Sequence, residues 1–315
     1  MKTAGPKTLQ EAIIYFADED VCVKTLAAIR FPDGVIPCPK CGQTEHYYLA
    51  SRRVWKCKNP ECHKQFSIKV GTIFEDSPIP LSKWLPAVWL LCNAKNGISS
   101  HELERGLGLS QKTTWYVLHR IRHAFGLPDV DSLNGEVEAD ETFIGGKARN
   151  QHKWQRVGKG RGSQDKAAVH GLIERGGNVV ATTVPNLEGP TLRGNIERYV
   201  APTATVYTDE FKAYALLGRK FDHHIIDHTV GYVNERVHTN TIENFWSLLK
   251  RGLRGTYVSV EPYHLSRYVD EQVFRFNERK DTDAGRFEKA LKLVSGKRLT
   301  YNELVGKMPA ADVEA

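Results

Sequence analysis

The feature that most constrains how this chain folds is a cluster of cysteines near its beginning. Four of the six cysteines belong to it: Cys38, Cys41, Cys57 and Cys62. Two residues separate the first pair, fifteen separate the two pairs, and four separate the second pair. Two cysteine pairs joined by a hairpin supply the four thiolates of a closed, structural zinc site. A module this small buries too little apolar surface to fold unaided, so we expect one zinc ion to hold a ribbon of short strands over residues 35–76.

The wide second pair leaves the fourth zinc ligand open between two neighbours. His63 follows Cys62 directly, and an imidazole nitrogen can replace a thiolate at a tetrahedral zinc ion. Aromatic and basic side chains are interleaved with the cysteines, which favours either contact with nucleic acid or an ordinary solvated ribbon face.

The composition is that of a folded protein with a basic excess. Lys and Arg number 44 against 37 Asp and Glu, which gives a formal charge of +7. A basic balance permits a polyanionic partner such as nucleic acid. No stretch approaches the roughly 18 apolar residues of a membrane span, and the first residues have no apolar core like that of a signal peptide. We therefore expect no membrane partner and a cytoplasmic location.

Two segments before residue 127 have the apolar spacing of helices. Residues 8–30 are expected to form one amphipathic helix that Pro32 and Gly34 end, within a helical segment over residues 1–34. The second segment, over residues 81–127, is predicted to be a helix-turn-helix region.

Residues typical of helix caps and turns in this second segment support that prediction. Ser99 or Ser100 can cap a first helix, residues 106–109 make a turn, and Ser110 can cap a second helix. The start of the second helix carries the kinds of side chain that reach base edges and phosphates in a major groove: Gln111, Lys112, Thr113 and Tyr116. The alternative is a helical hairpin that packs only against its neighbours.

After a boundary at residues 127–133, strands alternate with helices, which predicts an α/β fold. Three strands are expected first, at residues 136–144, 167–173 and 179–184. They are followed by a helix at 192–199, a strand at 205–207, a helix at 211–217, a strand at 224–226, and helices at 241–253 and 264–277. This order predicts a mixed sheet covered by flanking helices over residues 133–283, with residues 284–315 left as a C-terminal helix and tail.

Three acidic residues fall where this order of elements makes them converge. Asp140 lies in the first strand, Asp209 follows the fourth, and Glu243 begins the helix after the fifth. If the first and fourth strands are neighbours, Asp140 and Asp209 lie side by side and the helix brings Glu243 across from them. Three carboxylates at one point cannot all stay ionised without a cation. We therefore expect two Mg²⁺ ions, which Mn²⁺ can replace, for a displacement at phosphorus.

Each acidic residue also has a plainer explanation. Asp140 could belong to a charged strand face, because three glutamates lie within four residues of it. Asp209 could cap the helix expected at residues 211–217, and Glu243 could be a solvent-exposed charge on an amphipathic helix. The combination of the three favours the metal site.

Basic residues accompany the acidic ones. Lys250 stands seven residues after Glu243 and returns to nearly the same helix face, about 10 Å further along, where it can bind a phosphate. Further candidates for contact with DNA are the helix residues Arg251 and Arg254, and Lys153, Arg156 and Arg161 in a long basic loop. His228 and His238, near predicted turns, are acid–base or metal candidates whose commoner role is hydrogen bonding.

Six short blocks spread over residues 35–280 complete the pattern. The most specific two are Asp-Glu-Thr-Phe-Ile-Gly-Gly at 140–146 and Asn-Thr-Ile-Glu-Asn-Phe-Trp at 240–246. The others are Cys-Pro-Lys-Cys at 38–41, Gln-Phe-Ser at 65–67, Gly-Thr-Ile-Phe at 71–74 and Tyr-Thr-Asp-Glu at 207–210. Together they resemble bacterial insertion-sequence transposases of the DDE superfamily, in the subset with an amino-terminal zinc ribbon.

This resemblance implies a ribonuclease-H-like catalytic fold, with Asp140, Asp209 and Glu243 as metal ligands and Lys250 as the accompanying basic residue. It implies Mg²⁺-dependent hydrolysis at element ends in double-stranded DNA, then attack of the freed 3′ hydroxyl on target DNA, by at least a dimer associated with the nucleoid. Two alternatives share most of these features. One is an inactive DNA-binding regulator derived from a transposase, and the other is a metal-dependent nuclease without strand transfer.

Overall fold

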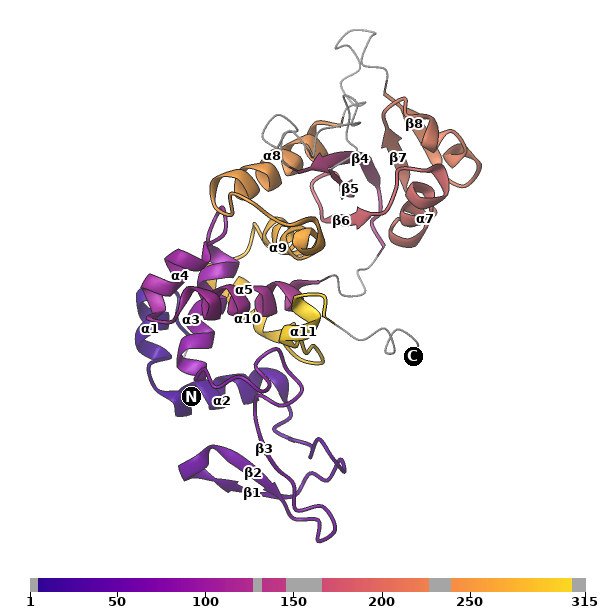
Figure 1. The fold of residues 1–315 in the computed structure, drawn as a ribbon. Helices are drawn as coiled ribbons and strands as arrows, with labels where there is room; N and C mark the ends of the chain where they lie inside the picture. Colours follow the sequence, from indigo (N-terminus) through magenta and orange to yellow (C-terminus); the bar gives the residue numbers. More distant parts are fainter. Residues whose placement is uncertain (1–4, 127–131, 146–165, 227–238, 308–315) are drawn as a thin grey trace. The chain divides into compact units, whose positions relative to one another are not determined.

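The computed structural model describes residues 5–126, 132–145, 166–226 and 239–307 (Figure 1). The chain folds into two compact units. Unit 1 contains Met1–Phe125 together with Lys280–Ala315, and unit 2 contains Gly126–Arg279. Within the described ranges, no helix is long and apolar enough to cross a membrane.

Unit 1 is mostly helical and includes one small sheet. Its helices are α1 (Leu9–Tyr15), α2 (Glu19–Arg30), α3 (Leu81–Asn93), α4 (Ser100–Leu107), α5 (Gln111–Phe125), α10 (Asp283–Lys292) and α11 (Tyr301–Leu304). The strands β1 (His46–Leu49), β2 (Val54–Cys57) and β3 (Gln65–Ser67) form an antiparallel sheet in the order β1-β2-β3. Trp55 in the central strand is buried and pairs with Tyr48 on one side and Phe66 on the other. This sheet lies within the ribbon expected over residues 35–76.

The segment expected to be one helix over residues 8–30 is two helices, so that prediction was wrong. α1 ends at Tyr15 and α2 begins at Glu19. Asp18 adopts an extended conformation and its carboxylate accepts a hydrogen bond from the N–H of Asp20, which caps α2. The apolar spacing continues across this cap, so spacing alone did not reveal it.

Helix α3 is capped by a side chain that is distant in the sequence. Its N-cap residue, Pro80, makes no side-chain cap. Instead, the carboxylate of Glu19 accepts hydrogen bonds from the N–H groups of Leu81 and Ser82, at 2.7 and 2.9 Å. These bonds satisfy two of the N–H groups that the first turn of a helix leaves without partners. They fix the start of α3 against the start of α2.

Residues 280–307 belong to the core of unit 1. α10 packs against α3, and the buried Phe287 contacts Trp89 and Phe16, with ring centroids 5.1 and 5.4 Å apart. The sequence pattern had placed residues 284–315 in a separate C-terminal helix and tail. In the structure the chain instead returns to unit 1 after it completes unit 2.

Helices α4 and α5, with the turn between them, lie where the helix-turn-helix was expected. Ser99 and Glu102 form a capping box at the start of α4, and Gly108 ends this helix with a φ of 61°. The hydroxyl of Ser110 accepts a hydrogen bond from the N–H of Thr113 at the start of α5. Ser99 and Ser110 therefore cap the two helices as expected, while the turn is shorter than predicted, because Gly106 and Leu107 still belong to α4.

Unit 2 is built on a mixed five-stranded sheet. Its strands are β4 (Glu136–Ile144), β5 (Ala167–Glu174), β6 (Val179–Val184), β7 (Thr205–Thr208) and β8 (Asp222–Ile225), and its helices are α7 (Gly189–Tyr199), α8 (Asn240–Gly255) and α9 (Leu265–Asn277). The strand order is β6-β5-β4-β7-β8 (Figure 1). β4 and β7 are parallel, as are β7 and β8, and the other pairs are antiparallel. The mixed sheet agrees with the prediction, and the first and fourth strands of this unit are neighbours, which is the condition on which the expected approach of Asp140 and Asp209 depended.

Alternation along the strands divides unit 2 into two cores. Val137 and Ala139 of β4 pack with α7 on one face of the sheet. On the other face, residues of β5 and β6 pack with α8 and α9. Since successive strand residues point to opposite faces, Glu138 and Asp140 lie on the face that α8 covers. The helix expected at residues 211–217 is replaced by two short 3₁₀ turns, Lys212–Tyr214 and Leu217–Arg219, so that assignment was wrong.

Candidate active site and zinc centre

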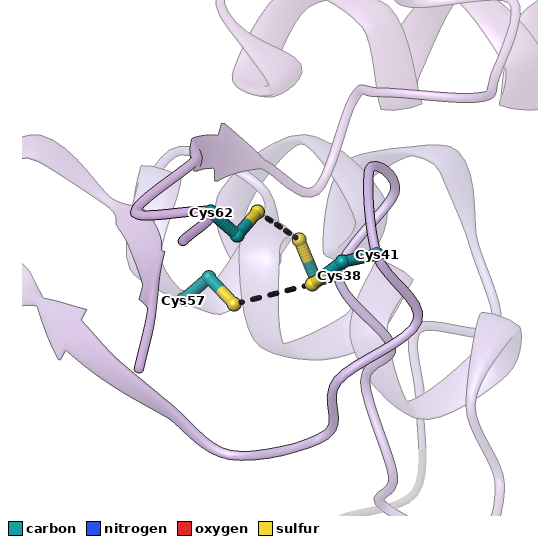
Figure 2. Close-up of side chains that lie close together, drawn as sticks. All are labelled: Cys38, Cys41, Cys57 and Cys62. Atoms are coloured by element: carbon teal, nitrogen blue, oxygen red, sulfur yellow. Dashed lines mark hydrogen bonds between the residues drawn. The ribbon is translucent and has the colours of Figure 1, made fainter. Parts of the chain in front are cut away.

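The four clustered cysteines come together as the spacing predicted. Their sulfur atoms all lie within 4.8 Å of one another, and Figure 2 shows them converging from two segments of the ribbon. Sγ of Cys38 lies 3.7 Å from Sγ of Cys62, and Sγ of Cys41 lies 3.6 Å from Sγ of Cys57. Cys62, and not His63, completes this group. Four thiols at these separations fit one tetrahedral zinc ion with no open position.

Backbone N–H groups in the first cysteine pair favour the thiolate form of Cys38. Burial acts to raise the pKa of Cys38, but the N–H groups of Lys40 and Cys41, with the neighbouring cysteines, outweigh it and lower the pKa to about 7. A thiol with a lowered pKa supplies a thiolate at neutral pH, which is the form that binds zinc.

Asp140 lies in β4 and is held by a residue of α8. The indole Nε1 of Trp246 donates a hydrogen bond to Oδ2 of Asp140 at 2.8 Å. Burial raises the pKa of Asp140, the bond from Trp246 opposes this, and the charges of Asp209 and Glu243 raise the pKa further. Both of these carboxylates are therefore close enough to Asp140 to affect its ionisation.

Asp209 directly follows β7, the parallel neighbour of β4. This pairing brings Asp209 toward Asp140 because parallel neighbouring strands point in the same direction. The carboxylate of Asp209 also accepts a hydrogen bond at 3.0 Å from the N–H of Phe211, which fixes the turn after the strand. The alternative role of Asp209 was to cap a helix at residues 211–217. In the structure one oxygen of its carboxylate instead makes a contact within a turn.

Glu243 lies in the first turn of α8, and its side chain is exposed. Lys250 lies further along α8, where burial and the charge of Arg254 lower its pKa and the charge of Asp140 only partly opposes them. Among the described residues, the cysteine cluster is the one set of three or more metal-ligating groups whose ligand atoms all lie within 4.8 Å. The carboxylates of Asp140, Asp209 and Glu243 therefore do not form so tight a set.

A polar chain that the sequence analysis did not single out lies beside this region. Tyr214 donates a hydrogen bond to Glu141, and His170 lies 3.3 Å from the Tyr214 hydroxyl. Burial raises the pKa of Glu141 to about 7, and the charges of Asp140 and Asp209 raise it as well, while the bond from Tyr214 lowers it. Burial lowers the pKa of His170 to about 4.

Two further residues of the site were missed from the sequence. Trp246 stands three residues after Glu243, one turn along the helix, and Glu138 stands two residues before Asp140 on the same strand face. These spacings could have suggested that Trp246 faces the strand and that Glu138 shares the face of Asp140. Neither could have shown which groups the two side chains bind.

The residues proposed to contact DNA fall in different environments. At the start of α5, Gln111 bonds to Ser100 at 2.9 Å and Lys112 is exposed. The hydroxyl of Tyr116 donates to the carbonyl of Leu299 at 2.8 Å, which directs this side chain into unit 1. Thr113 is half-buried, while Arg251 and Arg254 are exposed on α8. The basic loop residues Lys153, Arg156 and Arg161 lie outside the described residues, as do His228 and His238.

Comparison with known proteins gives two family matches and two similar curated proteins. Residues 132–277 match the ISXO2-like transposase domain, and residues 17–65 match a transposase zinc-ribbon domain. An uncharacterized protein in transposable element ISH50 of Halobacterium salinarum is 31% identical over 279 residues, covering 82% of this chain and 93% of that protein. An uncharacterized transposase-like protein of Haemophilus influenzae is 34% identical over 100 residues, covering 31% of this chain and 80% of that protein.

Proposed function

Since the chain belongs to the ISXO2-like transposase family, we propose that it cleaves and joins DNA strands with metal ions held by Asp140, Asp209 and Glu243. The observation that carries this proposal is the parallel pairing of β4 with β7. It brings Asp140 and Asp209 to one region of the sheet, and α8 carries Glu243 into the same region.

The chemistry of these donors fits Mg²⁺. Carboxylate oxygens are the ligands that Mg²⁺ prefers, and Mn²⁺ accepts the same set. The mutual charge effects that raise the pKa of Asp140 are those that a bound cation would relieve. Two such ions would activate the attacking oxygen and stabilise the leaving oxygen during displacement at phosphorus. The chain's own part is to hold Asp140 in place through Trp246.

Basic residues of α8 would bind the DNA backbone beside this site. Lys250 lies close enough to Asp140 for their charges to interact, so a phosphate bound there would lie near the carboxylates. Arg251 and Arg254 add exposed positive charge on the same helix. Both can make the phosphate contacts that position a duplex without reading its sequence.

Unit 1 would supply recognition of double-stranded DNA. The zinc ribbon and the helix pair α4 and α5 are its candidate elements, with the exposed Lys112 and the half-buried Thr113 in the first turn of α5. Gln111 and Tyr116 also belong to the DNA-contact prediction, but their polar groups bond within unit 1, so we expect smaller effects from them. The loop residues Lys153, Arg156 and Arg161 remain candidates for phosphate contacts. Joining two element ends to a target would require at least a dimer.

A joining assay tests this function against its two alternatives. A labelled duplex carrying the ends of the element that encodes this chain is incubated with a supercoiled plasmid and Mg²⁺. A transposase cuts the duplex and transfers the labelled 3′ end into the plasmid. A nuclease without strand transfer cuts but leaves the plasmid unlabelled, and a DNA-binding regulator retains the duplex on a gel without cutting it. Either of these last two results would overturn the proposal.

A further inference from the structure

A buried carboxylate from the sheet holds the N-terminus of α8. The side chain of Glu138 is 0% exposed, and its Oε2 accepts hydrogen bonds from the N–H groups of Thr241 and Ile242, both at 3.0 Å. Its Oε1 accepts from the hydroxyl of Thr241 at 3.0 Å and from Nε of Arg175 at 2.9 Å. With four donors around its two oxygens, Glu138 is fully engaged in the protein.

Helix α8 depends on this carboxylate because its own cap residue does not supply an acceptor. Thr239, the N-cap residue, makes no side-chain cap hydrogen bond. The first N–H groups of a helix need acceptors, and a negative charge at this end also interacts favourably with the helix dipole. Glu138 provides both from β4, and Arg175 balances its charge.

The second anchor of α8 lies two residues further along the same strand face. There, Trp246 donates its indole hydrogen bond to Asp140. Two strand residues span about 7 Å, and the five helical residues from Thr241 to Trp246 rise about 7.5 Å. The two anchors therefore keep α8 in register with β4, and Glu243 lies on the helical segment between them.

We propose that Glu138 is a positioning residue for the reaction: it fixes α8 on β4 so that Glu243 stays near Asp140. The inference rests on the proposed function, because it takes Asp140 and Glu243 as the metal-binding residues. It also excludes Glu138, which lies two residues before Asp140, from the residues that bind the metal ions. Because four donors surround its carboxylate, we assign Glu138 to the placement of α8.

Two substitutions weaken this anchor in different ways. Glu138→Gln keeps the shape of the side chain but removes its charge and turns one acceptor into a donor that faces N–H groups. Thr241→Val removes the hydroxyl bond alone, and Thr241→Ser restores it. The Thr241 pair keeps the experiment decisive if Glu138→Gln fails to fold.

Glu136→Gln is the matched control. Glu136 lies on the same strand and the same face, and it binds the same Arg175 at 3.1 Å and the hydroxyl of Tyr207 at 3.2 Å. The bonds that anchor the first turn of α8 come from Glu138. A general weakening of the charge network around Arg175 would therefore affect both glutamate variants.

The first measurement does not depend on activity. In the ¹⁵N-labelled full-length chain, the indole N–H resonance of Trp246, assigned with Trp246→Phe, reports the bond to Asp140. We expect Glu138→Gln and Thr241→Val to shift this resonance, while Glu136→Gln and Thr241→Ser leave it in place. A resonance unmoved by Glu138→Gln, or moved equally by Glu136→Gln, would overturn the inference. If Glu138→Gln does not fold, a resonance unmoved by Thr241→Val would overturn it.

The second measurement is single-turnover cleavage of the element-end duplex across a range of Mg²⁺ concentrations. We expect Glu138→Gln to cleave at least about tenfold more slowly than the parent and to need more Mg²⁺, with unchanged affinity for the duplex. Parental cleavage by this variant would overturn the inference. If the parent itself does not cleave, the proposed function fails, and the indole resonance still decides whether Glu138 positions α8.

Discussion

The indole Nε1 of Trp246 donates a hydrogen bond of 2.8 Å to Oδ2 of Asp140, which links the helix that carries Glu243 to the strand that carries the first acidic residue. The backbone of β5 makes this contact possible. Gly171 pairs with Asp140 across the sheet, and a Cβ atom there would lie 2.6 Å from the indole ring of Trp246. The site thus depends on a tryptophan and on the glycine that makes room for it.

Removal of the indole donor should impair the reaction more than DNA binding. In Trp246→Phe most of the ring packing is kept, but Oδ2 of Asp140 loses the hydrogen bond that orients the carboxylate. We expect cleavage to slow by roughly tenfold, as for other changes to groups that orient metal ligands. Cleavage rates and gel retention on the same duplex check this. Parental cleavage by the variant would show that the bond is dispensable.

A methyl group at Gly171 should destabilise unit 2. Gly171→Ala forces Trp246 and Ile242 to move, and overpacking of this kind costs about 1–3 kcal/mol of folding free energy. Gly194→Ala is the control, because nothing lies within 4 Å of the added Cβ in α7. Denaturant unfolding of the two variants measures the difference. Equal stability of Gly171→Ala and the parent would contradict the close packing, and combining it with Trp246→Phe should recover part of the loss.

Zinc should depend on the ribbon cysteines and on no other thiol. Cys57→Ser removes one of the four converging sulfurs, so we expect the purified chain to lose its bound zinc and the ribbon to lose its fold. Cys92→Ser is the control, since Cys92 is a buried thiol of α3 outside the cluster. Elemental analysis of both variants gives the zinc content per chain. Zinc retained in Cys57→Ser would refute the four-cysteine site.

The stability of unit 2 should fall as the pH decreases below about 6.5, in part through His170. Burial lowers the pKa of this imidazole from 6.5 to about 4. Between these values the unfolded chain takes up a proton that the folded chain does not, so the full stabilisation is present above pH 6.5 and is lost as the pH falls toward 4. The complete loss corresponds to about 3 kcal/mol.

His170→Gln tests this pH dependence. We expect the difference in unfolding free energy between the parent and this variant to shrink between pH 7.5 and pH 5. A difference between His170→Gln and the parent that stays constant with pH would contradict the assignment of this loss to His170.

The sequence predicted those parts of the fold that follow from local spacing. The cysteine pattern predicted the zinc centre, and the order of strands and helices predicted the mixed sheet, with Asp140 in its first strand and Asp209 directly after its fourth. Both rest on short-range rules: ligand spacing in one case and the alternation of strand and helix patterns in the other. No such rule predicts that the side chain of Glu138 is buried. Its hydrogen bonds to the first turn of α8 therefore could not be found from the sequence.

What the sequence did not predict depends on contacts between distant residues or on single caps. The break before α2 depends on the Asp18 cap, and the start of α3 is fixed by Glu19, more than sixty residues earlier. The return of α10 to unit 1 depends on Phe287 meeting Trp89. Apolar spacing shows that these side chains are buried, but it does not show which partner covers them.

The most direct test of the account is cleavage of the element-end duplex with Mg²⁺ by the parent and by Asp140→Asn, Asp209→Asn and Glu243→Gln, with binding of the same duplex measured in parallel. We predict that the parent cuts the duplex and that each variant binds it with parental affinity but does not cut it. Cleavage at the parental rate by any of the three variants would contradict the assignment of these carboxylates to one metal-dependent site.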